Sequence, residues 1–492
     1  MGRRGAAIVV LAVAVAAAAA VLARPAARSH PAAAPPSPAR GGSVEAQDDG
    51  RLTAQRVDAL VQAESQGLFG APAPRTTKPA TGWVGSRLLS ASTDDWEPAV
   101  ATDPAAPWVY LLTTRYGVLP PGCTSHCPSP FIALTISADG GSSFGQQVPL
   151  CVCLGQKGQY DPVIEVVPET GAVYAALLVG DRHDGFSTAF TKSTDHGRTW
   201  SAPVHVYGSV SWTDKPEITT SASGKDVYIS WNGPEGGDLY VGQSHDYGAT
   251  WTQQKLSDSK RYYYAYDARV LADGTVVFAE SSLEYSGSTN VQGEVWHHAV
   301  ISRDGGATWE DRVVAKVPVG ESCVADGCKP DYYLGQTSVV SDAPGHLVFA
   351  YEGPTTDGGP QRVYVATSSD AGRTWSAGAP VSVAGEDATG PRLAAYGGTV
   401  RLWYPQTSGG DDPDAWNVWY RTSADGGASW SAAVKISDAA AGAAGYVGQN
   451  GFAELYGDYG EIAVTSAGKT FATWGEGFSY TGPGGTWFNV QR

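Results

Sequence analysis

Acidic and aromatic residues recur together along this chain. The carboxylates are Glu97, Asp161, Asp214, Asp267 and Asp458, and the aromatic residues interleaved with them are Trp96, Tyr160, Tyr266 and Tyr459. Carboxylates accept hydrogen bonds from hydroxyl groups and can act as acid and base, while flat rings stack on sugar rings. A single carboxylate of this kind more often caps a turn or keeps a surface hydrated. Their recurrence, however, predicts that they line a functional pocket suited to a carbohydrate.

A second pattern, Ser-x-Asp-x-Gly-x-Ser/Thr-Trp/Phe, recurs along the chain at regular intervals. Its six copies begin at Ser137, Ser193, Ser244, Ser302, Ser368 and Ser423, and successive starts lie 51 to 66 residues apart. The Asp can accept hydrogen bonds from its own turn, the Gly tolerates a positive φ, and the aromatic residue pins a hairpin to its neighbour. Repeats of this length indicate supersecondary units that bury their cores only by stacking.

These copies are identified as Asp-boxes, also called BNR repeats, and the chain resembles the sialidase-like β-propellers that carry them. In that family the box lies at the edge of a blade, away from the axial pocket. The resemblance therefore implies that all six boxes are structural, and that any chemistry lies on the propeller axis near the starts of the inner strands.

The repeats predict an all-β propeller of four-stranded blades. Inner strands are expected to start near Trp96, Tyr160, Asp214, Tyr266, Gly335, Thr389 and Asp458. Seven starts predict seven blades, with six, the number in the known catalytic sialidases, as the alternative. The seventh unit keeps an eroded box over Tyr480–Trp487 and stops at Arg492 without an outer strand. We expect Ser86–Ser90 to supply that strand and close the ring.

Three regions are expected along the chain. Residues 1–23 have Arg3 and Arg4 before an apolar run and predict a secretory signal peptide, with a retained membrane anchor as the alternative. Residues 24–82 predict an Ala- and Pro-rich linker with a short helix near 52–66. Residues 83–492 are expected to form the propeller. We therefore expect a secreted, extracellular monomer, with retention at the cell envelope as the alternative location.

The six cysteines come in close couples, which in an exported chain predict disulfides. Zinc binding would favour a Cys-x-x-Cys spacing, which does not occur. We expect a bridge between Cys323 and Cys328. The other four cysteines are expected to cross-link the loop of Cys123 and Cys127 to the segment of Cys151 and Cys153, leaving no free thiol.

The overall charge limits the classes of partner. With 33 Lys and Arg against 49 Asp and Glu, the formal net charge is −16, which disfavours nucleic acid and stable membrane insertion. An anionic ligand would need a local arginine cluster. Asp411, Asp412 and Asp414 fit either a calcium loop or a solvated acidic loop, and we expect no metal or cofactor.

Retaining sialidases share three arginines that clamp a carboxylate, a Tyr nucleophile paired with a Glu, and an Asp acid/base. The resemblance of Gly171–Gly185 to one family stretch assigns Arg182 to the clamp and Asp184 to acid/base catalysis. Asp458–Ile462 resembles the nucleophile segment and points to Tyr459, with Glu217 as its partner. The family's Phe-Arg-Ile-Pro motif is Asp-Trp-Glu-Pro here. The remaining candidates are Arg269 and Arg392 for the clamp, Arg115 as a further arginine, Tyr266 as a rival nucleophile or substrate contact, and Asp161 and Asp267 as substrate contacts.

Two classes of function fit these residues. The first is an exo-acting glycoside hydrolase of sialidase type, and the second is a non-catalytic extracellular propeller that binds a glycan or a protein. A hydrolase for neutral sugars that uses two ring carboxylates is a further form of the first class. At least three arginines converging on one axial cavity would favour the sialidase type, whereas a mouth of carboxylates would repel an anionic sugar.

Overall fold

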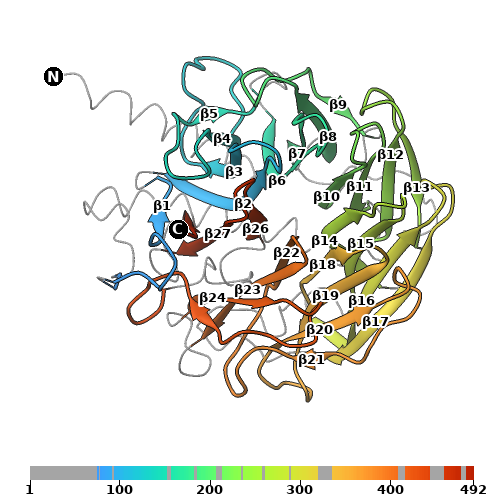
Figure 1. Cartoon of the computed structure of the whole chain (residues 1–492). Helices are drawn as coiled ribbons and strands as arrows, with labels where there is room; N and C mark the ends of the chain where they lie inside the picture. The colour runs from blue at the N-terminus through green and yellow to red at the C-terminus, as the bar shows by residue number, and fades with distance from the viewer. Residues whose placement is uncertain are drawn as a thin grey trace, which may run out of the picture.

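The chain forms a ring of β-sheets, described here from a computed structural model (Figure 1). The structure describes residues 75–76, 78–90, 93–151, 157–181, 185–206, 213–233, 237–257, 261–286, 290–319, 335–407, 416–443, 459–477 and 484–492. Their strands make seven four-stranded antiparallel sheets. The predicted seven-bladed all-β propeller is confirmed, and the six-bladed alternative is wrong. The expected signal peptide and the helix near 52–66 lie outside the described residues.

Each blade runs from an inner strand near the axis to an outer strand at the rim (Figure 1). The inner strands are β2 (Asp94–Thr102), β6 (Gly158–Val166), β10 (Asp214–Thr220), β14 (Tyr262–Val270), β18 (Thr337–Ala343), β22 (Arg392–Tyr396) and β26 (Glu461–Val464). The second strands are β3 (Val109–Tyr116), β7 (Val173–Asp181), β11 (Val227–Asn232), β15 (Val276–Ser286), β19 (His346–Gly353), β23 (Thr399–Thr407) and β27 (Thr470–Gly477).

The third strands lead into the Asp-boxes, and the outer strands follow them. The third strands are β4 (Phe131–Ser137), β8 (Gly185–Ser193), β12 (Leu239–Ser244), β16 (Asn290–Ser302), β20 (Arg362–Ser368), β24 (Trp416–Ser423) and β28 (Gly484–Val490). The outer strands are β5 (Val148–Pro149), β9 (Val204–His205), β13 (Thr252–Lys255), β17 (Glu310–Pro318), β21 (Ala379–Pro380), β25 (Val434–Lys435) and, in the last blade, β1 (Arg87–Leu88).

The N-terminal strand closes the ring, as predicted. Arg87 pairs with Phe488 and Leu88 with Trp487 in antiparallel register, so β1 is the outer strand of the last blade. Each inner strand contacts the next around the axis, and β26 contacts β2. Pairing with β1 covers the edge of β28 that would otherwise present unpaired backbone groups to another chain.

Residues before β1 also lie on the propeller, where a linker was expected. Arg75 bonds the Ser437 carbonyl at 2.8 Å, pairs with Glu476, and stacks 3.5 Å from the centroid of the Trp487 ring. Trp83 is 2% exposed. Arg75 and Trp83 therefore both pack at the junction of the last two blades.

All six Asp-boxes share one local hydrogen-bond pattern. In the second box, Ser193 Oγ donates to Asp195 Oδ1 at 2.8 Å and accepts from Gly197 N. Asp195 also accepts from the Thr199 N–H and hydroxyl, and these bonds hold the pKa of Asp195 at about 2. Because the carboxylate of each box accepts hydrogen bonds from its own turn, the boxes have the structural role that was expected.

The hydrophobic core lies between neighbouring blades. One cluster combines Leu112 and Leu134 of the first blade with Val173 and Leu177 of the second. The box glycines sit at such junctions: Gly248, at φ +76°, has no room for a Cβ because the Phe190 ring of the preceding blade lies there. Blades therefore stack through the box as well as through the core.

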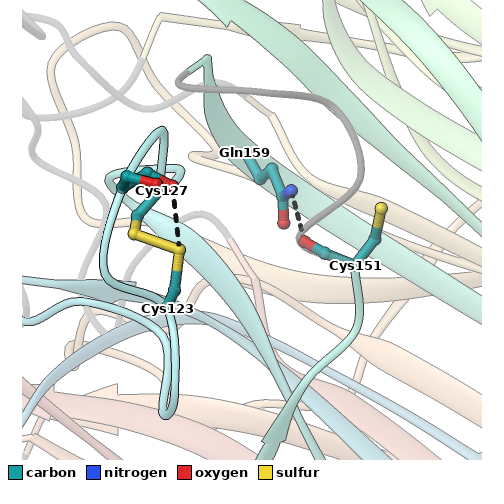
Figure 2. The surroundings of a disulfide bond; sticks show 5 residues. Cys123, Cys127, Cys151 and Gln159 are labelled. Carbon is teal, nitrogen blue, oxygen red and sulfur yellow. Dashed lines mark hydrogen bonds between the residues drawn. A yellow bond between two sulfur atoms is a disulfide. The ribbon is translucent and has the colours of Figure 1, made fainter.

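The disulfides correct one prediction. Cys123 is bridged to Cys127, with Cα atoms 5.9 Å apart, rather than to the Cys151 segment (Figure 2). The two cysteines lie in one tight loop, within the Cα separation that a disulfide spans, so the local pairing prevails. Cys151 is disulfide-bonded as well, and no described cysteine is a free thiol. Cys153, Cys323 and Cys328 lie outside the described residues.

No helix in the described part of the chain has the length and apolar character needed to cross a bilayer.

Candidate functional site

The predicted carboxylates do not start the inner strands of the first blades but sit inside them, at bulges. Pairing of β2 with β3 breaks between Trp96 and Ala99, and that of β6 with β7 between Tyr160 and Val163. Glu97 and Asp161 have positive φ angles of 54° and 49°. A bulge with a left-handed residue re-aims side chains, and non-glycine residues keep such angles only where their surroundings fix them.

Three of the predicted carboxylates link one blade to the next. The Asp161 N–H donates to Glu97 Oε2 at 3.0 Å, and the Lys215 N–H lies 3.4 Å from Asp161 Oδ2. Asp267 Oδ2 accepts from the Val339 N–H at 3.0 Å and from the Ser338 hydroxyl. Glu97, Asp161 and Asp267 thus satisfy backbone donors of the following blade, a structural task that the sequence did not indicate.

A second set of carboxylates gathers on the axis around two arginines. Glu165, Glu217 and Glu461 come from β6, β10 and β26. Arg269 of β14 lowers the pKa of all three, and Arg392 of β22 lowers those of Glu217 and Glu461. We call Glu165, Glu217, Glu461, Asp267, Arg269 and Arg392 the axial cluster. Residues from five inner strands therefore share one electrostatic environment, although they lie far apart in the sequence.

Burial dominates the titration of this cluster. It raises the pKa of Glu165 to about 8, with Asp267 adding to the shift and Arg269 opposing it. It raises the pKa of Glu461 to about 7 and that of Glu217 well above the usual range, each with Asp267 adding and Arg392 and Arg269 opposing. Since Glu461 itself also raises the pKa of Glu217, the cluster retains protons near neutral pH.

Both axial arginines are occupied by nearby acceptors. Arg269 Nη1 donates to Asp267 Oδ1 at 2.6 Å. Arg392 is 2% exposed and donates from Nε to the Gly460 carbonyl at 2.8 Å and from Nη1 to the Pro391 carbonyl at 3.2 Å. The third described candidate, Arg115, makes a buried bidentate pair with Asp95 on the neighbouring strand, both distances being 2.7 Å.

Aromatic rings and one lysine complete the axial region. Lys215 is 1% exposed, and its Nζ lies 5.0 Å from the Tyr459 ring centroid and 5.7 Å from that of Tyr264. Arg392 Cζ lies 5.9 Å from the Tyr266 ring centroid. The structure thus brings together the predicted Tyr459, Tyr266, Glu217, Arg269 and Arg392.

Sequence reasoning missed Lys215, Glu165 and Glu461. A signal for the first existed, because Lys215 precedes Pro216 just as Glu97 precedes Pro98 and Asp161 precedes Pro162. Aligning the repeats on that proline places Lys215 in the carboxylate column. The predicted Arg182, Asp184 and Asp458, and the acidic loop of Asp411, Asp412 and Asp414, lie outside the described residues. Within the described residues, no three His, Cys, Asp or Glu side chains are grouped to hold a metal.

Comparisons with known proteins return structures but no sequence family. No protein family model matches the chain, and no curated protein sequence matches it significantly. A protein of unknown function from Dyadobacter fermentans is 15% identical, covering 83% of this chain and 99% of its own, with a TM-score of 0.46. A polysaccharide lyase, an ulvan lyase, is 11% identical, covering 83% and 95%, with a TM-score of 0.49. The NanB sialidase from Streptococcus pneumoniae is 11% identical, covering 85% and 70%, with a TM-score of 0.43.

The blades define the class of fold: a seven-bladed, all-β propeller whose third strands lead into the six repeated boxes.

Proposed function

We propose that the axial cluster is the active site of a glycoside hydrolase acting on neutral glycans outside the cell. One observation carries this proposal: Glu217 and Glu461 are electrostatically coupled carboxyl groups on the propeller axis, and both have raised pKa values. Glycoside cleavage needs one carboxyl group that is protonated near neutral pH and a second that is ionised. Extracellular action fits the Cys123–Cys127 disulfide, since such bonds persist in oxidising compartments.

The two carboxyl groups would divide the chemistry between them. Glu217, whose pKa burial raises well above its usual range, would donate a proton to the glycosidic oxygen as the bond to the anomeric carbon breaks. Glu461 would attack that carbon or activate a water. The positive charge that develops on the sugar ring would be stabilised by the surrounding carboxylates, and Tyr459 and Tyr266 would supply flat faces.

Charge supports a neutral rather than an anionic sugar. The axial cluster has four carboxyl groups and two arginines, and Arg269 and Arg392 already donate to Asp267 and to backbone carbonyls. A sialidase-type site would need at least three arginines free to clamp a substrate carboxylate. That version, with Tyr459 as nucleophile, Asp184 as acid/base and Arg182 in the clamp, stays a prediction.

The second candidate function is non-catalytic glycan binding. It is favoured by the finding that Glu97, Asp161 and Asp267 satisfy backbone donors of adjacent blades, so part of the acidic ring is structural. An axial mouth of this kind would bind sugar hydroxyl groups without cleaving them.

A panel of aryl glycosides that includes an aryl sialoside tests these functions. The wild type should release the aryl group from at least one neutral glycoside. Glu217→Gln and Glu461→Gln should each lower kcat/KM about 100-fold or more, whereas Glu310→Gln, at an exposed site on β17, should leave it unchanged.

Each outcome decides between the candidates. Turnover of no substrate in the panel would reject hydrolysis of these sugars and favour the binding function. Turnover of the sialoside alone, abolished in Tyr459→Phe, would replace the neutral-sugar proposal by the sialidase type. Turnover that survives both glutamine variants would reject the assigned carboxyl groups.

A further inference from the structure

A polar pocket lies between the third and fourth blades. It encloses about 440 Å³ and is lined by the β10–β11 turn, the end of β14 and the fourth Asp-box. Because strands alternate in direction within each blade, these segments lie at the end of the propeller opposite the inner-strand bulges that contain Glu97 and Asp161. We call it the interblade pocket, and its polar lining includes Asp226, Tyr228, His245, Asp273, Arg303 and Asp304.

Two variable positions of the Asp-box meet in this pocket. The residue between the Ser and the Asp of the box is Ala138, Thr194, Ser369 or Ala424 in four copies, but His245 and Arg303 in the third and fourth. Only these two carry long nitrogen-bearing side chains, and both line the pocket. The box needs neither residue for its own hydrogen bonds, so their presence in adjacent blades is not explained by the turn.

Two nitrogen atoms of the Arg303 side chain lack a hydrogen-bond partner within the described residues. Its Nη1 and Nη2 atoms are withdrawn from solvent and make no hydrogen bond within the described residues. Burial lowers the pKa of Arg303, and the nearby Arg373 adds to the effect. A guanidinium that has lost water without gaining acceptors is costly, so a ligand oxygen at these nitrogens would recover that loss.

The other polar groups are acceptors and a ring. Asp226 Oδ1 lies 2.8 Å from His245 Nδ1, and Asp273 is held ionised because the Thr275 N–H lowers its pKa. The rings of Tyr228 and His245 meet edge to face, 6.2 Å between centroids. A carboxylate has about four lone-pair sites, so both can accept further bonds.

We propose that the interblade pocket binds a neutral saccharide of one or two sugar units. Its hydroxyl oxygens would accept from Arg303 and its hydroxyl groups would donate to Asp226 and Asp273, with the Tyr228 ring as an apolar wall. A volume of 440 Å³ suits a ligand of that size. Such a site would hold a glycan chain at the end of the propeller opposite the bulges of Glu97 and Asp161.

Other ligand classes fit less well. An anion would meet Arg303 but also Asp226, Asp273 and Asp304, which would repel it. A metal ion would meet Arg303, and Asp304 is already occupied by Thr308 N, Thr308 Oγ1 and Ser302 Oγ. Only a ligand with many neutral donors and acceptors satisfies both kinds of group.

Calorimetric titration of the full chain with cellobiose, maltose and lactose tests this proposal. The background should be the Glu217→Gln/Glu461→Gln double variant, in which the axial residues cannot turn the sugar over. At least one disaccharide should bind, and Arg303→Ala and His245→Ala should each weaken it about tenfold or more. Thr194→Ala, at the same box position of the second blade, should bind like the background, and thermal unfolding should confirm that all variants fold.

Failure here is distinguishable from failure of the proposed hydrolase. Disaccharide binding that Arg303→Ala and His245→Ala leave unchanged would overturn the pocket assignment without touching the axial chemistry. Absence of binding to all three sugars would also overturn it. Binding of glucuronate or glycine, but of no neutral sugar, in an Arg303-dependent way would show that the ligand class is wrong.

Discussion

At the scale of single residues, carboxyl groups take two different roles in this molecule. Asp267 accepts hydrogen bonds from Val339 N and the Ser338 hydroxyl of the next blade. Glu165, two blades away, is half-buried near Arg269, and its removal from solvent raises its pKa to about 8. At Glu165 the effect of burial exceeds that of the nearby Arg269, because removal from water disfavours the ionised carboxylate.

The raised pKa values predict how stability depends on pH. The folded chain holds protons on Glu165 and Glu461 that the unfolded chain releases above about pH 4.5. Their contribution is therefore complete below that pH and is lost as pH rises through 7 to 8. In Glu165→Gln the free energy of unfolding should fall less steeply between pH 5 and 8, by about 1 to 3 kcal/mol over that range.

Chemical denaturation at several pH values measures this effect. The exposed Glu310→Gln variant is the control and should keep the wild-type slope. An unchanged slope in Glu165→Gln would mean that this carboxyl group is not protonated in the folded protein at neutral pH.

At the scale of elements, the Asp-box joins blades as well as turning a hairpin. Gly140 and Gly248 both belong to boxes and both have positive φ, at +71° and +76°. A Cβ on Gly140 would meet nothing within 4 Å, whereas one on Gly248 would overlap the Phe190 ring of the preceding blade. Alanine at Gly140 would therefore test backbone strain alone, whereas alanine at Gly248 would test strain together with packing between blades.

Alanine at these two glycines should give different losses of stability. Gly140→Ala should cost about 1 kcal/mol through its backbone conformation alone. Gly248→Ala should cost about 2 kcal/mol more, because Phe190 must move. Thermal and denaturant unfolding measure both, and equal losses would contradict the packing role of the box glycine.

At the scale of the whole molecule, stability depends on closing the ring. β28 pairs with β27 on one side and with the N-terminal β1 on the other, so the two ends of the chain meet in one blade. Trp83, next to β1, packs in a cluster that spans the last blades.

Truncation after Tyr480 removes β28 and should abolish a single cooperative unfolding transition. Tryptophan fluorescence and circular dichroism should then give transitions that do not coincide. Val84→Ser, at a residue 43% exposed beside β1, is the control and should unfold like the wild type. A truncated chain with one sharp transition would show that closure is dispensable.

The cysteines add a prediction at the same scale. We expect Cys323 and Cys328, outside the described residues, to be bridged, because the described cysteines are all bonded and an exported chain favours disulfides. Thiol titration of the unreduced, denatured protein should find no free thiol, and a stoichiometric one would contradict this pairing.

The sequence by itself determined the architecture. The six boxes and the seven strand starts predicted seven blades, and the short segment around Arg87 predicted the closing strand, because each pattern reports a local turn or strand and the repeats add up to a ring. The resemblance to sialidase-like propellers suggested Tyr459 and Glu217 as candidates, with Tyr266 as the rival of Tyr459.

The tertiary structure alone decided which charged residues work together. Glu97 and Asp161 bind backbone of the next blade, Arg269 pairs with Asp267, and Lys215 reaches the Tyr459 ring from four blades earlier in the chain. Cys123 likewise pairs within its own loop. These partners are set by distances across the axis and between blades, and a pattern read along one chain contains no information about which side chains the closed ring brings within a few ångströms.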